Sequence, residues 1–102
     1  MSVERIWFRV SGTVQGVGFR DFTQKAAVRQ NLKGWCRNTT CGRVEGEVQG
    51  DQEALKKFLQ EIDKGPRMSH VVKVEKREVD SHEREDSFVV LRTGESVFQP
   101  ES

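Results

Sequence analysis

The strongest constraint on the fold of this chain is an apolar stripe that repeats at helical spacing. Its members lie at positions i, i+3, i+4 and i+7, namely Leu55, Phe58, Leu59 and Ile62. Asp51 before the stripe suits the N-cap position, and Gly65-Pro66 after it is the usual order at a helix end. A helix with one apolar face must bury that face against another layer of structure.

A second helix is predicted before this one. Good helix formers fill residues 21–32, where Phe22, Ala26 and Ala27 can pack against a neighbouring layer. Asn31 can adopt the left-handed conformation that stops a helix.

The remaining patterned segments predict strands. Alternating or valine-rich residues occupy 4–12, 34–38, 42–48, 71–79 and 87–92. In the first strand, one face carries Ile6, Phe8 and Val10, and the other carries Arg5, Trp7, Arg9 and Ser11. The second and third strands form a hairpin across residues 39–42, in which Gly42 can take a positive φ.

The order of these elements is β-α-β-β-α-β, and the last β unit can be one strand or two. Two amphipathic helices on one mostly antiparallel sheet of four to five strands make a two-layer sandwich. The predicted fold class is therefore α+β with the ferredoxin-like arrangement. We expect one domain over 1–92 and a loosely ordered C-terminal tail over 93–102.

The charge balance limits the classes of partner. The chain has 102 residues, with 17 Lys plus Arg and 16 Asp plus Glu, so its formal net charge is +1. Such a balance gives no case for a nucleic acid or an anionic membrane as partner. No apolar run is long enough to cross a bilayer, and residues 1–5 show no signal-peptide pattern, so we expect a cytoplasmic protein.

Cysteine and histidine usage predicts neither a disulfide framework nor a metal site. Cys36 and Cys41 are too few for a framework, although a single bridge between them stays open as the less favoured alternative. His70 and His82 are distant from both cysteines in sequence, so no metal ligand set is expected. Cys36 is expected to pack in the hairpin as a small apolar residue.

A glycine-dense segment between the first strand and the first helix carries the candidate chemistry. Gly16 and Gly18 permit backbone angles closed to other residues and let the main chain approach a ligand. The N–H groups of residues 15–20 could form an anion nest, and the planar guanidinium of Arg20 fits phosphate oxygens. In isolation the loop has an alternative of about equal weight, a plain turn with Arg20 paired to a surface carboxylate.

Known phosphate-binding motifs match this loop to different degrees. A Walker loop needs Gly-Lys-Ser/Thr after it, which is missing, and Asp21 stands where a dinucleotide fingerprint has its third glycine. In contrast, residues 12–20, Gly-Thr-Val-Gln-Gly-Val-Gly-Phe-Arg, closely resemble the acylphosphatase signature G-x-V-Q-G-V-x-F-R.

The resemblance to acylphosphatases extends to a second motif. Residues 34–38, Gly-Trp-Cys-Arg-Asn, and 42–46, Gly-Arg-Val-Glu-Gly, are similar to the family's G-W/Y-x-x-N and the following G-x-V-E. The order and spacing of the motifs match, and the resemblance covers roughly residues 4–91. The chain departs from the family pattern at two places. Cys41 in the hairpin turn affects the turn, and Gln30 and Asn31 at the end of the first helix affect packing and capping.

The resemblance implies a role for each motif residue. In acylphosphatases the loop arginine holds the phosphate, here Arg20, and the asparagine that ends the second strand positions the attacking water, here Asn38. The cradle is completed by the loop amides, here those of Gln15, Gly16, Val17, Gly18 and Phe19. Thr39 is a candidate for a supporting hydrogen bond to the site.

The implied reaction is hydrolysis of the carboxyl–phosphate bond of a small acyl phosphate, with no cofactor and no metal. Inorganic phosphate would be both product and inhibitor, and the protein would be a monomer. Such a reaction needs charge neutralisation and alignment more than a strong base. Arg20 and the amides would stabilise the phosphoryl oxygens. Asn38 would aim the water but cannot take its proton, so the substrate phosphate is the expected acceptor.

Asn38 also has a structural alternative, because an asparagine at a strand end, taken alone, more often satisfies a turn.

Two other functions compete with this interpretation. RNA-recognition domains share the β-α-β-β-α-β order, but they place aromatic residues on a central strand, and Trp7 and Trp35 are better suited to packing. A phosphate- or carbamoyl-phosphate-binding module of a larger maturation system is the second alternative. The short chain without a second domain disfavours it.

Overall fold

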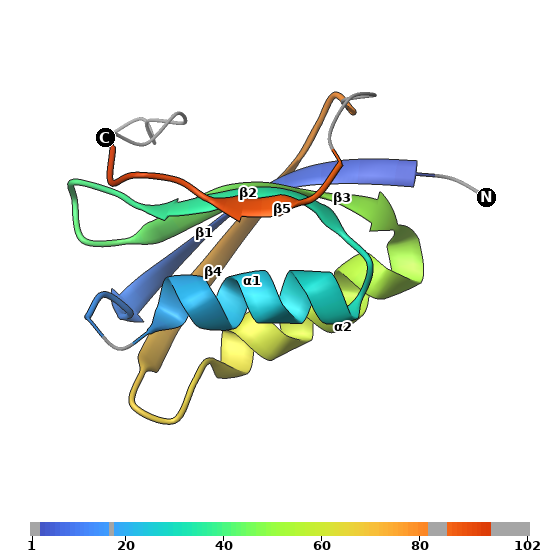
Figure 1. Cartoon of the computed structure of the whole chain (residues 1–102). Helices are drawn as coiled ribbons and strands as arrows, with labels where there is room; N and C mark the ends of the chain where they lie inside the picture. The colour runs from blue at the N-terminus through green and yellow to red at the C-terminus, as the bar shows by residue number, and fades with distance from the viewer. Residues whose placement is uncertain (1–2, 17, 82–85, 95–102) are drawn as a thin grey trace.

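The computed structural model describes residues 3–16, 18–81 and 86–94, which form two helices and five strands in two layers (Figure 1). The elements are β1 (Val3–Thr13), α1 (Phe19–Arg29), β2 (Lys33–Asn38), β3 (Val44–Asp51), α2 (Gln52–Lys64), β4 (His70–Val79) and β5 (Phe88–Val90). The predicted strand bounds agree with these within a few residues. In the described part of the chain, no helix is long and apolar enough to cross a membrane.

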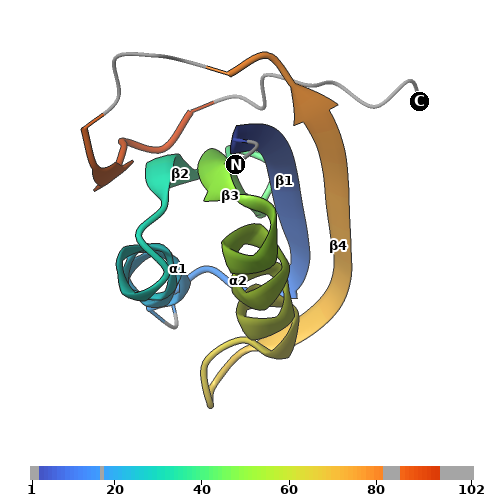
Figure 2. The ribbon, with the colours of Figure 1, turned by 90° about the vertical axis from the view of Figure 1, so that its right-hand side faces the viewer.

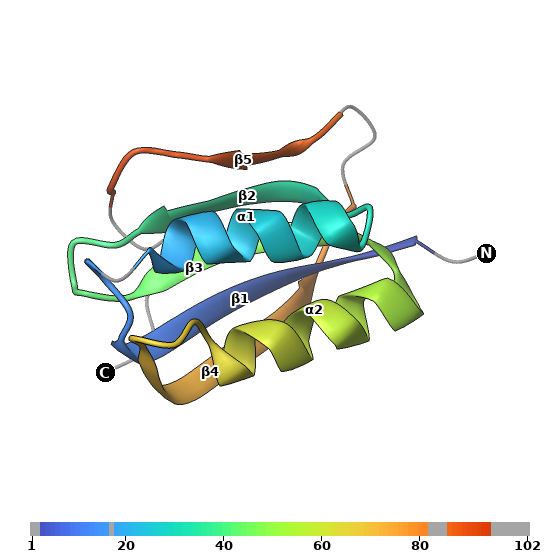
Figure 3. The same cartoon turned by 60° about the horizontal axis from the view of Figure 1, so that its bottom comes forward.

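The strands form one sheet in the order β4-β1-β3-β2-β5. The β4–β1, β1–β3 and β3–β2 neighbours are antiparallel, and β5 pairs with β2 in parallel. Both helices lie on the same face of the sheet, as Figure 2 shows from near their ends. The last β unit is thus two strands at opposite edges of the sheet (Figure 3). This confirms the predicted ferredoxin-like α+β fold.

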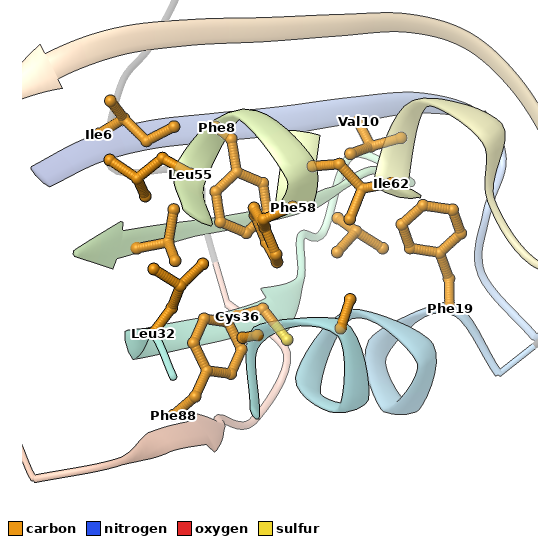
Figure 4. Packing of buried hydrophobic residues seen from close by; sticks show 14 of the residues in the cluster. Ile6, Phe8, Val10, Phe19, Leu32, Cys36, Leu55, Phe58, Ile62 and Phe88 are labelled. Atoms are coloured by element: carbon orange, nitrogen blue, oxygen red, sulfur yellow. The ribbon is translucent and has the colours of Figure 1, made fainter. Parts of the chain in front are cut away.

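Aromatic side chains join the two layers at the centre of the core (Figure 4). The rings of Phe8 on β1 and Phe58 on α2 meet edge to face with centroids 5.3 Å apart, and Phe88 of β5 lies 6.3 Å from Phe58. Leu55, Phe58 and Ile62 of the predicted stripe are buried, so the stripe is the face that α2 packs on the sheet. Burying such side chains contributes about 1.5–3 kcal/mol each.

Helix α1 is displaced from its predicted bounds at both ends. It spans Phe19–Arg29 rather than 21–32, because Gly18 already takes the N-cap position with φ 76°. Asn31 has φ 58°, which confirms its left-handed conformation. The amide of Leu32 donates to the Ala27 carbonyl at 2.9 Å, and this bond closes the helix in a Schellman motif.

The ends of α2 and the hairpin turn follow the sequence closely. Asp51 is the N-cap of α2, although its side chain makes no capping bond, and Gly65 ends the helix with φ 72°. Gly42 has φ 87°, and its amide donates to the Thr39 carbonyl at 3.2 Å, which confirms the predicted turn between β2 and β3.

The sheet face opposite the helices carries a buried polar layer. Arg5, Trp7 and Arg9 of β1 are only 2%, 1% and 3% exposed. Arg5 Nε donates to a Glu47 carboxylate oxygen at 2.6 Å, and Trp7 Nε1 donates to Glu45 at 3.3 Å. The alternation in β1 predicts only that these side chains lie on the face opposite the helices. Hydrogen bonds to side chains of neighbouring strands are what satisfy their polar groups there.

Candidate functional site

The glycine loop, the β2–β3 turn and the segment after β5 meet at one end of the molecule, on the left in Figures 1 and 3. Gly94 forms a parallel bridge with Thr39, and its amide donates to the Asn38 carbonyl at 3.1 Å. The sequence motifs that are about eighteen residues apart are thus brought together by the pairing of the strands that carry them.

The two loop glycines are required by their backbone angles. Gly16 and Gly18 both have φ 76°, and a Cβ at either position would meet no atom within 4 Å. The left-handed conformation rather than lack of space therefore disfavours a side chain there. Val17 lies outside the described residues, so the structure gives no account of its amide.

The N-terminus of α1 presents amide groups that the protein does not use. Gly18 offers no side-chain cap, and none of the described residues accepts a hydrogen bond from the amides of Phe19, Arg20 or Asp21. Such amides and the helix dipole favour an anion at this end. The ring of Phe19 is buried in the core, so this residue can offer the site only its main chain.

Arg20 places a cation beside these amides. It is half-buried, and its guanidinium makes no hydrogen bond or ion pair with any residue that the structure describes. The Sγ of Cys36 lies 3.7 Å from the Arg20 carbonyl oxygen, which fixes this turn of α1 against β2. The alternative of a surface ion pair for Arg20 is therefore absent from the described structure.

Burial keeps the neighbouring Cys36 thiol neutral. Desolvation raises the pKa of Cys36 to about 12, and the nearby charge of Arg20 offsets only part of this effect. Cys36 is fully buried in the hydrophobic core, as the sequence predicts, and neither it nor Cys41 forms a disulfide. At neutral pH the Cys36 thiol is protonated and cannot serve as a nucleophile.

Asn38 ends β2 on the side of the sheet that faces α1. It lies two residues after Cys36, so the two side chains share one face of the strand. Asn38 is half-buried, and its carboxamide has no hydrogen-bond partner within the described ranges. Asn38 and the first turn of α1, which carries Arg20, thus lie on the same face at the same end of the sheet (Figure 1), and no described residue pairs with either side-chain head group.

Gln15 and Thr39 are occupied in holding the site together. Gln15 Nε2 donates to the carbonyls of Thr39 at 2.9 Å and Arg43 at 3.0 Å, which ties the loop to the hairpin turn. Thr39 is 1% exposed, and its hydroxyl accepts a bond from the Arg43 amide at 3.0 Å. The sequence does not predict this use of the Gln15 side chain, since carbonyls 24 and 28 residues away leave no sequence pattern.

The exposed thiol of Cys41 sits in the same turn. Its Sγ lies 3.1 Å from the Thr39 hydroxyl oxygen and accepts a bond from Arg43 Nη1 at 3.5 Å. These two hydrogen bonds, with that from Thr39 the larger effect, hold the pKa of Cys41 below the usual 9.0. The departure from the family pattern at this position thus gives the turn an exposed thiol whose pKa is lowered.

A groove of about 800 Å³ lies elsewhere, between α2 and β4. Its apolar floor is made by Ile6, Leu55, Leu59 and Val74. None of the predicted site residues lines it. Charged side chains lie at its rim, and it is separate from the glycine loop and from the N-terminus of α1.

The other side chains singled out in the sequence lie away from this cradle. Trp7 is nearly fully buried, and Trp35 packs with the Arg37 guanidinium 5.1 Å from its ring centroid. His70 is exposed on the edge strand β4. His82 lies outside the described residues.

Comparisons with known proteins agree with the sequence motifs. Residues 6–90 match the family model described as acylphosphatase. The chain is 42% identical over 85 residues to an acylphosphatase of Geobacillus kaustophilus, which covers 81% of this chain and 90% of that protein. The crystal structure of acylphosphatase from Bacillus subtilis is similar with a TM-score of 0.83 at 34% identity, over 88% of this chain and 99% of that one.

A much larger protein contains a similar unit. The crystal structure of full-length HypF in the phosphate- and nucleotide-bound form is similar with a TM-score of 0.85 and 29% identity. The match covers 94% of this chain but only 13% of that one.

Proposed function

Because the chain belongs to the acylphosphatase family, we propose that the 15–20 loop and Arg20 hold the phosphoryl group of the substrate while Asn38 places the attacking water. The chain is an acylphosphatase, a hydrolase that cleaves the carboxyl–phosphate bond of a small acyl phosphate. The observation that carries the residue roles is that the guanidinium of Arg20 has no described protein partner, and neither have the amides of the helix turn that carries it.

The phosphoryl group would sit on the N-terminus of α1. Amides of the loop and of the first turn would donate to its oxygens, and the Arg20 fork would supply a charge-assisted pair of bonds. These donors are fixed before the substrate binds, so they stabilise the charge that develops on the phosphoryl oxygens without reorganisation in the transition state.

Asn38 would hold the water on the side opposite the leaving group. Its carboxamide oxygen accepts a hydrogen bond from the water, which directs a lone pair of the water oxygen at phosphorus. The new P–O bond forms as the bond to the acyl oxygen breaks, and the acyl group leaves as a carboxylate. The proton of the water goes to a phosphate oxygen.

No strong base is required at this end of the molecule. Asp21, the carboxylate in the first turn of α1, is paired with Lys25 at 3.0 Å and is exposed. Cys36 is neutral, because burial holds its pKa at about 12. The carboxylate of an acyl phosphate is a good leaving group, so positioning and charge neutralisation are sufficient for the reaction.

The proposal also covers inhibition, cofactor need, domain bounds, oligomeric state and location. Inorganic phosphate competes for the cradle as a product inhibitor, and the reaction proceeds without metal or cofactor. The catalytic domain spans 1–92 and acts as a monomer in the cytoplasm, and 93–102 is a tail that begins along the β2–β3 turn, where Gly94 pairs with Thr39. Thr39 supports the site through the hairpin turn.

A second candidate function rests on the similarity to full-length HypF, whose match includes only a small part of that chain. In that case the chain would act as the acyl-phosphate-handling unit of a larger assembly. Activity of the isolated chain separates the two, since a free-standing enzyme needs no partner.

The direct experiment is hydrolysis of benzoyl phosphate by the purified chain, with EDTA and with inorganic phosphate added in turn. We expect turnover that EDTA leaves unchanged and that phosphate inhibits competitively. Loss of turnover with EDTA would contradict a metal-independent reaction. Turnover that appears only after a cell extract is added would favour the larger assembly.

A further inference from the structure

One side chain bridges the two halves of the proposed site. The phosphate loop belongs to the β1–α1 connection, whereas Asn38 belongs to the β2–β3 hairpin. Gln15 joins them, since its side chain extends from the loop and its carboxamide nitrogen donates hydrogen bonds to the hairpin carbonyls of Thr39 and Arg43. We infer that the Gln15 side chain is a positioning residue that sets the distance between the bound phosphoryl group and the water held by Asn38. This inference rests on the proposed roles of Arg20 and Asn38.

Chemistry fixes the orientation of this carboxamide. Nε2 lies 2.9 Å from the Thr39 carbonyl oxygen and 3.0 Å from the Arg43 carbonyl oxygen, and both carbonyls can only accept. A flipped amide would place Oε1 against two oxygens, so the nitrogen must face them. Both N–H groups of the side chain are therefore used, which holds the end of Gln15 at two points.

The two accepting carbonyls belong to the first and last residues of the turn between β2 and β3. Thr39 directly follows Asn38, and its own amide donates to the Arg43 carbonyl at 2.8 Å. Thr39 is also nearly fully buried, so it is a packed anchor for the end of the Gln15 side chain. Only one peptide unit separates this anchor from Asn38, so the Gln15 side chain sets the position of the loop relative to Asn38.

The same geometry separates positioning from binding. Because both side-chain N–H groups of Gln15 are committed to the hairpin, the side chain has no donor left for a phosphate oxygen. Loss of the side chain leaves the loop amides and Arg20 in place, so phosphate affinity should hold while the alignment of water and phosphorus degrades. A misplacement of about 1 Å can lower a rate by about 100-fold.

The test uses Gln15→Met, which keeps the length of the side chain and removes its donors. Gln24→Met is the matched control, because Gln24 Nε2 also donates to a backbone carbonyl, that of Phe88 at 3.0 Å, away from the proposed site. We expect kcat of Gln15→Met toward benzoyl phosphate to fall at least tenfold. KM and the inhibition constant of inorganic phosphate should stay within about twofold, and Gln24→Met should match the wild type.

A double variant separates positioning from general damage to the fold. If Gln15 acts through Asn38, then Gln15→Met combined with Asn38→Ala should be no slower than Asn38→Ala alone. A full additional loss in the double variant, or a matching loss of phosphate affinity in Gln15→Met, would overturn the inference. So would a wild-type kcat in Gln15→Met.

Two further measurements keep the outcomes distinguishable. Thermal melts establish that each variant is folded at the assay temperature. If Gln15→Met is not folded, Gln15→Asn replaces it, because its side chain is one methylene too short for its amide to reach both carbonyls. The kcat, KM and phosphate-inhibition outcomes expected of Gln15→Met then apply to Gln15→Asn. An Asn38→Ala variant with full activity would refute the proposed site itself rather than the positioning role.

Discussion

Replacing Arg20 by alanine is a test that separates function from stability. The guanidinium has no partner among the residues described, so its removal breaks no contact that holds the fold. The free energy of unfolding should therefore change by no more than about 0.5 kcal/mol. In the reaction, however, the substitution removes a fixed charged donor from the transition state.

The size of the loss follows from the donors that remain. One preorganised donor contributes about 3 kcal/mol to transition-state stabilisation, which corresponds to roughly 100-fold in rate. The loop amides stay in place, so residual activity should be measurable. We expect kcat/KM for benzoyl phosphate to fall at least about 100-fold in Arg20→Ala, with weaker inhibition by inorganic phosphate because ground-state binding also loses a charge.

Arg9 provides the matched control. It is 3% exposed, and its Nη2 pairs with a Glu75 carboxylate oxygen at 2.9 Å on the face of the sheet opposite the helices. Arg9→Ala should lower the free energy of unfolding by about 2 kcal/mol, below the cost of a fully buried broken pair because Glu75 remains partly exposed. Its kcat/KM should stay near that of the wild type.

The assay pairs benzoyl phosphate hydrolysis with urea unfolding followed by tryptophan fluorescence. The reasoning is refuted if Arg20→Ala keeps kcat/KM within a few-fold of the wild type. It is also refuted if Arg20→Ala loses as much stability as Arg9→Ala, since the guanidinium would then be a structural group.

Three further outcomes follow from the same structure. Asn38→Ala should lower kcat while KM changes little, because water positioning matters in the transition state; steady-state kinetics would contradict this by showing a raised KM at full kcat. Iodoacetamide at pH 8 should label Cys41 and leave Cys36 unlabelled in the folded protein, because the pKa of Cys41 is lowered and that of Cys36 is raised to about 12. Peptide mass spectrometry reads this, and a labelled Cys36 counts against its burial. Phe58→Ala should cost about 3–5 kcal/mol in urea unfolding, because its ring packs on both Phe8 and Phe88; a loss below 1 kcal/mol would contradict that packing.

Local signals in the sequence were sufficient for most of the architecture. The apolar stripe from Leu55 to Ile62 is the buried face of α2, and Asn31 and Gly42 take the positive φ values that their positions suggest. Each of these features depends on residues a few positions apart. The start of α1 was wrong because Gly18 caps the helix through its backbone conformation, which leaves no side-chain signal.

Features that depend on distant pairing were not accessible from one sequence. Nothing in residues 87–92 indicates that β5 pairs in parallel with β2; packing of Phe88 against the core accounts for that position. Burial of Arg5 and Arg9 likewise depends on carboxylates supplied by other strands. The motifs located Arg20 and Asn38, but the hydrogen bonds of Gln15 to the hairpin required coordinates.

The most direct test of the central claim is a crystal structure of the chain with inorganic phosphate bound. The account predicts a phosphate ion at the N-terminus of α1, with its oxygens within hydrogen-bond distance of the loop amides and the Arg20 guanidinium and with the Asn38 carboxamide facing the ion. An ion bound only in the groove between α2 and β4, with Arg20 turned toward solvent, would contradict it.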